Sequence, residues 1–192
     1  PENQVEFRDE VFQVKAPFDG QPESLFKTKD RFYLVQWGNQ NTALFYDYWW
    51  NTRQIRTTLF DPSNLDQAPI ELSARNYQDV YSDPGNYVTT QNEFGEDILM
   101  IEDGQAYLMG EGYTEAGQFP FIDQYDFKTK ETTRLYQSEY TDKIEDLNDA
   151  IDLGDGEVLV RIESPTEYPN YYVRNFKNDS LQQITDFKNP LV

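Results

Sequence analysis

The sequence predicts an all-β protein, a partial β-propeller built of four-stranded antiparallel blades. Aromatic residues make up 16% of the chain and stand in short runs with β-branched residues, which suit half-buried strands. Clusters of Pro, Gly, Asn and Asp separate these runs and predict tight turns. A hairpin made of an aromatic strand, a polar tip and a second strand occurs three times along the chain.

The spacing of the three hairpins favours a propeller. Their tips lie 77 and 49 positions apart, at Thr52, Thr129 and Asn178. A hairpin that recurs at roughly 40–50 residues is typical of propeller blades. The wider first interval must then hold an insertion or a further, degenerate blade. An ordinary antiparallel β-sandwich, whose strands are also short and regularly spaced, is the alternative.

The whole chain is expected to be part of one propeller domain, with approximate blade units at residues 1–69, 70–140 and 141–192. Alternating or apolar runs predict further strands, in chain order at Val11–Lys15, Arg31–Trp37, Ile70–Asn76, Tyr87–Thr90, Ile98–Ile101, Ala106–Gly110 and Val158–Ile162. The segment from Asp142 to Leu153 is ambiguous. Its apolar residues Ile144, Leu147 and Ile151 have helical spacing, so a short helix is possible, but its acidic residues are equally consistent with a solvated face.

Composition excludes several classes of function. The net charge is −19, from 35 acidic and 16 basic residues, which argues against binding to nucleic acid or to anionic membranes. The chain has no cysteine and no histidine, so it can form neither disulfides nor a Ser-His-Asp or Cys-His arrangement. We expect no cofactor and no metal site. No transmembrane run and no signal peptide is visible. The compartment stays open, with a periplasmic or secreted location favoured over a cytoplasmic one.

The candidate binding residues lie in the first hairpin, which holds all three tryptophans. Arg53, Arg56 and Trp50 are predicted to contact substrate, because a guanidinium group binds a carboxylate through two parallel hydrogen bonds. The alternative is structural. In that interpretation Trp49 and Trp50 pack between blades, and the two arginines pair with nearby acidic residues.

The first hairpin also resembles part of a known family. Trp37-Gly38, Ala43-Leu44 and the run from Trp49 to Thr57 resemble the propeller of the glutamyl endopeptidase branch of the prolyl oligopeptidase-like serine peptidases. The resemblance continues in order at Arg75–Gly85, Tyr107–Gly112, Pro120–Asp123, Arg134-Leu135, Glu163–Pro165, Pro169–Tyr172 and Thr185–Pro190. It therefore extends over nearly the whole chain.

The resemblance implies an N-terminal propeller over a C-terminal α/β-hydrolase domain that carries the catalytic Ser, Asp and His. We expect that domain after residue 192, and we do not expect this chain alone to be an enzyme. In such enzymes the propeller limits which substrates reach the catalytic site and favours peptides over folded proteins. The glutamyl branch cleaves after acidic residues. The implied partners are a peptide substrate and the hydrolase domain of the same parent chain.

An incomplete propeller would expose sheet edges, so self-association is also expected. Two other functions stay open. One is a stand-alone propeller that binds a protein or another ligand. The other is a carbohydrate-active β protein that uses a pair of its carboxylates.

Overall fold

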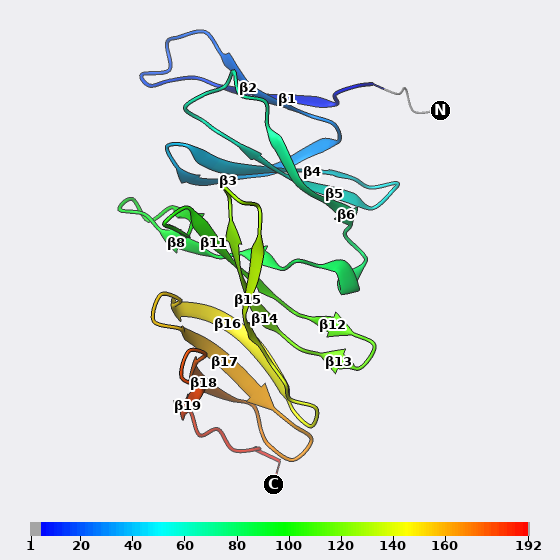
Figure 1. Cartoon of the computed structure of the whole chain (residues 1–192), viewed down its shortest axis with the longest axis vertical. Coiled ribbons are helices and arrows are strands. Elements are labelled where there is room, and N and C mark those ends of the chain that lie inside the picture. The colour runs from blue at the N-terminus through cyan, green and yellow to red at the C-terminus, as the bar shows by residue number, and fades with distance from the viewer. Residues whose placement is uncertain (1–4, 192) are drawn as a thin grey trace. The chain divides into compact units, whose positions relative to one another are not determined.

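The computed structural model describes residues 5–191, and its regular elements there are antiparallel β-strands apart from one short 3₁₀-helix (Figure 1). The strands divide into two compact units. The first unit contains the residues up to Asp79 together with Thr89–Leu99, and the second contains Val80–Val88 and the residues from Met100 onward. None of the helices in the described part of the chain is both long and apolar enough to cross a membrane.

The first unit is built around a four-stranded sheet in which each strand pairs with the next one in sequence. This sheet has the order β3 (Arg31–Asn39), β4 (Thr42–Trp49), β5 (Gln54–Phe60) and β6 (Ile70–Asn76). Two hairpins complete the unit, formed by β1 (Asp9–Gln13) with β2 (Glu23–Thr28) and by β8 (Thr89–Gln91) with β9 (Asp97–Leu99). An up-and-down sheet of four antiparallel strands is the architecture of a propeller blade.

Stacked aromatic rings form the core of the first unit. Phe26 of β2 lies on Phe45 of β4 with the ring centroids 4.0 Å apart and the planes nearly parallel. Phe60 of β5 meets the Phe26 ring edge-on at 5.0 Å. Leu25 and Ala43 complete this buried cluster. A few large rings therefore supply much of the apolar area that a chain of modest hydrophobic content can bury.

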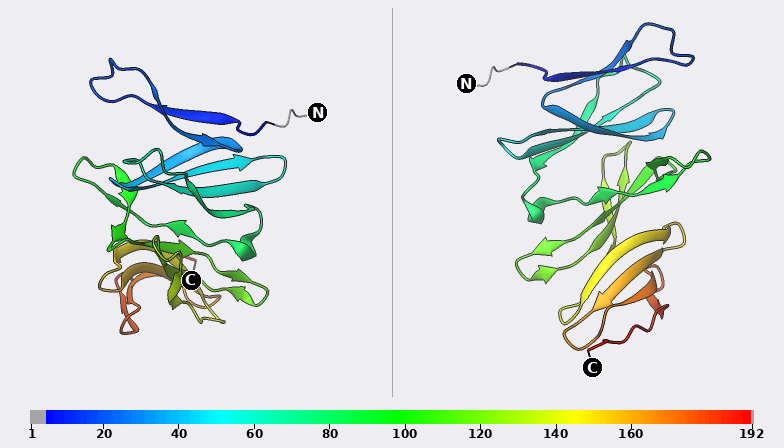
Figure 2. Two further views of the ribbon diagram at one scale, coloured as in Figure 1. Left: turned by 45° about the horizontal axis from the view of Figure 1, so that its top comes forward. Right: turned by 180° about the vertical axis from the view of Figure 1, so that it is seen from behind.

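The second unit holds a five-stranded sheet and a second four-stranded sheet. The five-stranded sheet consists of β10 (Ile101–Glu102), β11 (Gln105–Gly110), β14 (Phe121–Asp126) and β15 (Thr132–Gln137), with β7 (Asn86–Tyr87) also paired to β11. The four-stranded sheet consists of β16 (Ile144–Asp152), β17 (Glu157–Glu163), β18 (Asn170–Asn175) and β19 (Ser180–Gln183), which lie side by side in Figure 2. The remaining elements are the 3₁₀-helix η1 (Val80–Ser82) and a hairpin of β12 (Tyr113–Thr114) with β13 (Gly117–Gln118).

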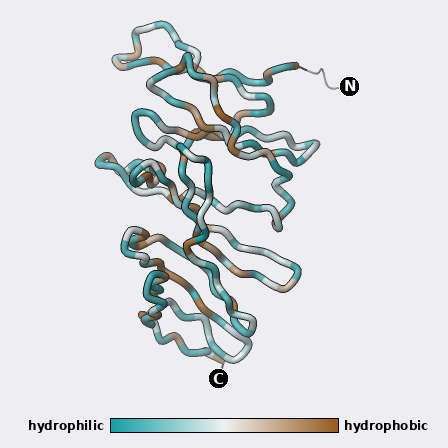
Figure 3. Tube along the Cα trace, viewed as in Figure 1, coloured by the Kyte–Doolittle hydropathy of each residue, from teal (hydrophilic) through white to brown (hydrophobic). Residues whose placement is uncertain are grey.

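Strict alternation along β17 builds the core of the second unit. Val158, Val160 and Ile162 are buried, whereas the residues between them are only partly covered. These three side chains pack with Tyr107, Ile122 and Leu153. In Figure 3 the hydrophobic residues gather in the strands, and hydrophilic residues occupy much of the connecting loops.

These sheets confirm the predicted fold class, an all-β partial propeller made of four-stranded antiparallel blades. The three predicted hairpins are β4–β5, β14–β15 and β18–β19. The longer first interval between their tips contains the additional hairpins β8–β9 and β12–β13. The expected unit boundary between residues 69 and 70 does not match the sheets, because Ile70–Asn76 forms β6 and pairs with β5.

The ambiguous segment before Leu153 is a strand rather than a helix. β16 pairs with β17 along its length, but its register shifts between Leu147 and Asp149 and again between Ala150 and Asp152. Each irregularity inserts an extra residue and moves the buried positions by one. The resulting burial pattern lacks the strict alternation that identifies a strand in sequence.

Candidate functional site

The tip of the β4–β5 hairpin places Trp50 and Arg53 close together. Arg53 has a positive φ of 59°, and Lys130 and Asp179 have similar values just before the second strand of the other two hairpins. The backbone N–H of Arg53 donates to the Trp50 carbonyl at 3.3 Å, and the Arg53 carbonyl accepts from the Tyr77 N–H at 2.8 Å. This turn folds the Arg53 side chain back over the tip.

Arg53 and Trp50 form an exposed cation–π pair. The Arg53 guanidinium carbon lies 3.9 Å from the centroid of the Trp50 ring, and its Nη1 donates to the Trp50 carbonyl oxygen. Trp50 remains 63% exposed. Among the described residues, no carboxylate pairs with Arg53. The tip therefore presents an aromatic surface and a positive charge that is free to meet an anionic group.

Arg56, three residues further on, has a different environment. It lies directly opposite Asp47 in the β4–β5 register and pairs with Asp30, with Asp47 at 3.6 Å and with Glu71 at 3.4 Å. Burial works to lower the pKa of Arg56, but the three carboxylates outweigh it and raise that pKa above its usual value. The structure therefore separates the two predicted arginines. Arg56 is a partner of acidic residues within the fold, and only Arg53 is presented beside Trp50.

Trp49 also has a structural contact. The Arg8 guanidinium carbon lies 3.8 Å from the centroid of the Trp49 ring. Trp49 is half-buried, whereas Trp50 is exposed. Of the two adjacent tryptophans, Trp49 ends β4 and packs against Arg8, whereas Trp50 lies in the turn that follows and stays exposed.

Asp47 is the most deeply buried acid of this cluster and was not predicted from the sequence. It is 2% exposed. Its Oδ2 accepts from the Asp30 backbone N–H at 2.7 Å, but its Oδ1 accepts no hydrogen bond from any described residue. Burial raises the pKa of Asp47 above its ordinary value, against the opposing effects of the Asp30 N–H and of Arg56.

A cavity of about 170 Å³ adjoins Asp47 within the first unit. The N-terminal segment and residues of β2, β4, β5 and β6 enclose it, together with the residues just after β2 and just before β6. The lining residues are Phe7, Lys27, Lys29, Phe45, Asp47, Arg56, Thr58, Pro69 and Glu71. Three of them are cationic and two are anionic, in a chain whose net charge is −19. This concentration of positive charge is a local exception to the composition.

The second unit has its own buried ion pair. Glu145 is 1% exposed, and its two oxygens accept from Arg174 Nε at 2.7 Å and from the Tyr136 hydroxyl at 2.6 Å. Arg174 also donates to the Tyr140 hydroxyl at 3.1 Å. Burial, followed by the contact with Glu145, raises the pKa of Tyr136. Both oxygens of this carboxylate are thus hydrogen-bonded, unlike those of Asp47.

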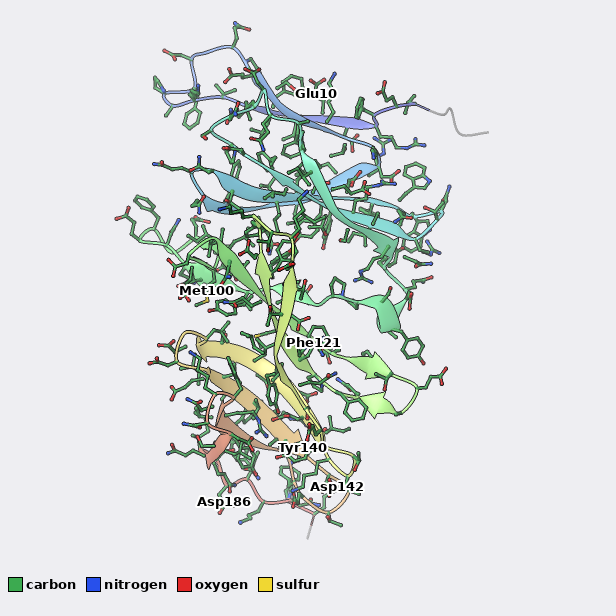
Figure 4. The ribbon with its side chains drawn as sticks, viewed as in Figure 1. Glu10, Met100, Phe121, Tyr140, Asp142 and Asp186 are labelled. Atoms are coloured by element: carbon green, nitrogen blue, oxygen red, sulfur yellow. The ribbon has the colours of Figure 1, made fainter. Side chains whose placement is uncertain are left out.

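The second unit also carries an open groove of about 600 Å³ beside its last sheet. Tyr140 and Asp186, both labelled in Figure 4, contribute from the segments that precede β16 and follow β19. Lys143 and Lys188 line the groove too, but each is paired with a carboxylate, Glu167 and Asp186 respectively. The described residues contain no group of three or more metal-ligating side chains placed to hold a metal ion.

Comparisons with known proteins give two relatives of the same name. A protein of Oryza sativa subsp. japonica named "Probable glutamyl endopeptidase, chloroplastic" is 33% identical over 202 residues, and one of Arabidopsis thaliana with the same name is 31% identical over 203. Each alignment covers 97% of this chain but only 22% and 21% of the relative, so the chain spans about a fifth of their length. No protein-family model matches the chain.

Among solved structures, TolB from Acinetobacter baumannii is similar, with a TM-score of 0.43 and 14% sequence identity. The match covers 92% of this chain and 37% of that one. The assignment of the fold rests on the strand order and pairing described above.

Proposed function

We propose that this chain is a non-catalytic propeller segment of a larger serine peptidase of the prolyl oligopeptidase type, and that it controls access of peptides to the catalytic site. The observation that carries the proposal is the similarity, over 97% of the chain, to two proteins named probable glutamyl endopeptidase. Because the chain spans about a fifth of their length, it would supply one part of such a protein.

The composition supports a non-catalytic role for this part. The chain has no histidine, so the general base of a Ser-His-Asp triad must come from another segment. In the proposal this segment is an α/β-hydrolase domain that follows residue 192. The blades then act by limiting which substrates reach the catalytic serine.

Within this proposal, Trp50 and Arg53 make the contact with substrate. Arg53 pairs with no carboxylate among the described residues, and Trp50 offers an exposed ring beside it. An ion pair at such an exposed position contributes up to about 1 kcal/mol, which favours an acidic peptide over a neutral one by up to about fivefold. Arg56 is excluded from this role because three carboxylates already surround it.

Labelling of the native protein tests the peptidase assignment. An antibody against this segment would capture the native polypeptide, and a fluorophosphonate probe would then label an activated serine. We expect a labelled polypeptide far larger than the 22.6 kDa of this chain. An unlabelled polypeptide near 22.6 kDa would instead indicate a stand-alone binding module.

A substitution in the full-length peptidase tests the role of Arg53. Arg53→Gln should lower kcat/KM for substrates with Glu before the cleaved bond by up to about fivefold, and leave Leu substrates nearly unchanged. Lys130→Gln is the matched control, because Lys130 also has a positive φ at a hairpin tip and also loses one charge. Equal losses on Glu and Leu substrates would leave Arg53 with a structural role only.

We also propose that the isolated chain self-associates through its sheet edges. Among the described residues, β16 and β19 each pair on one side only, so each presents unpaired backbone groups. Sedimentation velocity should show oligomers that become more abundant with concentration. A monomer throughout the micromolar range would refute this expectation.

A further inference from the structure

The buried Oδ1 of Asp47 marks a second site, unrelated to the hairpin tip. Asp47 is 2% exposed, yet this oxygen accepts no hydrogen bond from the described residues. A buried charged acceptor without a donor is strongly unfavourable, since it has lost its hydration without replacement. The Asp30 N–H and Arg56 both approach the other oxygen, Oδ2. A donor group beside Oδ1 would remove this cost.

The cavity beside Asp47 is also lined by two lysines whose ammonium groups have few hydrogen-bond partners. Lys27 Nζ lies 3.9 Å from the Glu10 carboxylate, beyond hydrogen-bond distance, and makes no hydrogen bond among the described residues. Lys29 Nζ makes a single contact at 3.3 Å, to Glu71. An ammonium group carries three donors, so both lysines can bind a further acceptor. The same cavity therefore offers an unsatisfied acceptor and unsatisfied donors.

The charges of the lining residues disfavour ligands of a single sign. A simple cation at Asp47 would leave the donors of Lys27 and Lys29 without an acceptor, and both ammonium groups would repel it. A simple anion would satisfy the lysines but would leave Asp47 Oδ1 without a donor and would add a like charge beside it. A ligand with a positive donor at one end and a carboxylate at the other end satisfies both sets of groups.

We propose that this cavity binds a small zwitterion of the α-amino acid class. The ligand's ammonium group donates to Asp47 Oδ1, and its carboxylate accepts from Lys27 and Lys29. At about 170 Å³ the cavity is smaller than the pockets that hold drug-sized ligands, which fits a molecule of a few non-hydrogen atoms. This proposal does not depend on the peptidase assignment, because every contributing residue lies in the first unit of this chain.

Titrations with glycine, acetate and methylammonium test the proposal. Glycine carries both charges, acetate carries only the carboxylate, and methylammonium carries only the ammonium group. Each would be titrated into the full chain at fixed ionic strength and followed by NMR through the backbone amide of Asp30. That amide donates to Asp47 Oδ2 and so reports directly on the carboxylate. We expect saturable binding of glycine, at least about tenfold tighter than binding of acetate or methylammonium.

Three variants make the test specific. Asp47→Asn removes the charge at nearly constant volume, and Lys27→Gln removes the cation at the other end of the site. Each should weaken glycine binding at least about tenfold. Lys27 is half-exposed, so its substitution leaves the fold intact even if Asp47→Asn proves unstable. Glu131→Gln is the control, because it removes an exposed acidic residue in the second unit and should leave the affinity unchanged.

Several outcomes would overturn the proposal. Acetate or methylammonium binding as tightly as glycine would mean that the site recognises one charge only. The absence of saturable binding at millimolar glycine would mean that solvent alone serves Asp47 Oδ1. Unchanged affinity in both Asp47→Asn and Lys27→Gln would place any glycine binding elsewhere on the chain.

Discussion

Replacing Arg174 by methionine should destabilise the second unit severely. Arg174 is 5% exposed and donates from Nε to Glu145 at 2.7 Å. The substitution leaves Glu145, itself 1% exposed, with only the Tyr136 hydroxyl as a donor. It also removes the hydrogen bond from Arg174 to the Tyr140 hydroxyl. Methionine fills much of the same space, so the expected effect is electrostatic rather than steric.

Removing one partner from a buried ion pair costs about 3–5 kcal/mol, a large fraction of the roughly 5–15 kcal/mol that stabilises a typical domain. With a denaturant slope of about 2 kcal/mol/M, the urea midpoint should fall by about 1.5–2.5 M. Arg161→Met is the matched control in the same sheet. Arg161 pairs with Asp146 at 2.8 Å and Glu163 at 2.9 Å but is more exposed, so its loss should cost about 1 kcal/mol or less.

Urea unfolding followed by far-UV circular dichroism measures both losses. Tryptophan fluorescence gives a separate signal, because all three tryptophans lie in the first unit. The double variant Arg174→Met with Glu145→Gln removes both charges while keeping an acceptor for Tyr136, and should recover most of the lost stability. A double variant no more stable than Arg174→Met alone would refute an electrostatic origin of the loss. A loss below about 1 kcal/mol for Arg174→Met would refute it as well.

Three further predictions concern single positions. The pKa of Asp47 is raised in the folded state above its ordinary value of 3.8. The stability that goes with this shift is fully present at pH values below 3.8 and is lost as the pH rises through the folded-state pKa. Thermal melts from pH 3 to 7 should therefore show Asp47→Asn becoming steadily more stable relative to the wild type. Asp126 is the opposite case, because the backbone N–H groups of Thr129 and Lys128 lower its pKa. Asp126→Asn should therefore be less stable than the wild type at neutral pH, and this difference should vanish as the pH falls below 3.8. Gly112→Ala should cost about 2 kcal/mol or more in urea unfolding, because φ is +63° and the new Cβ would overlap a backbone carbonyl, whereas Gly20→Ala meets nothing and should be nearly neutral.

The sequence predicts most of the sheets because alternation and turn residues act locally. The exception is β16, where Glu145 is buried while Ile144 and Ile151 are exposed. This reversal has two physical causes. A buried arginine from β18 stabilises the carboxylate, and two register shifts move the inward positions along the strand. Both causes depend on partners distant in sequence, so local spacing indicated only a possible short helix or a solvated face, and not a strand.

The candidate site, too, could be predicted from the sequence only in part. The pairing of Trp50 with Arg53 follows from a short hairpin tip, and the sequence identified both residues. The environment of Arg56 could not be predicted, because Asp30 precedes β3 and Glu71 belongs to β6. The unpaired Oδ1 of Asp47 could not be predicted either, since it depends on which donors in other strands fail to reach it.

The arginines of this acidic chain mostly neutralise carboxylates held within the fold. Arg56 faces Asp47 across β4–β5, and Arg134 faces Asp123 in the equivalent register across β14–β15. In the last sheet the arrangement changes, because Arg174 lies on the first strand of its hairpin and draws its acid, Glu145, from β16. An arginine is therefore weak evidence for an anion site in this chain unless it lacks such a partner. By this criterion Arg53 is the stronger candidate for contact with an acidic peptide, and Arg56 is part of the scaffold that holds the hairpin.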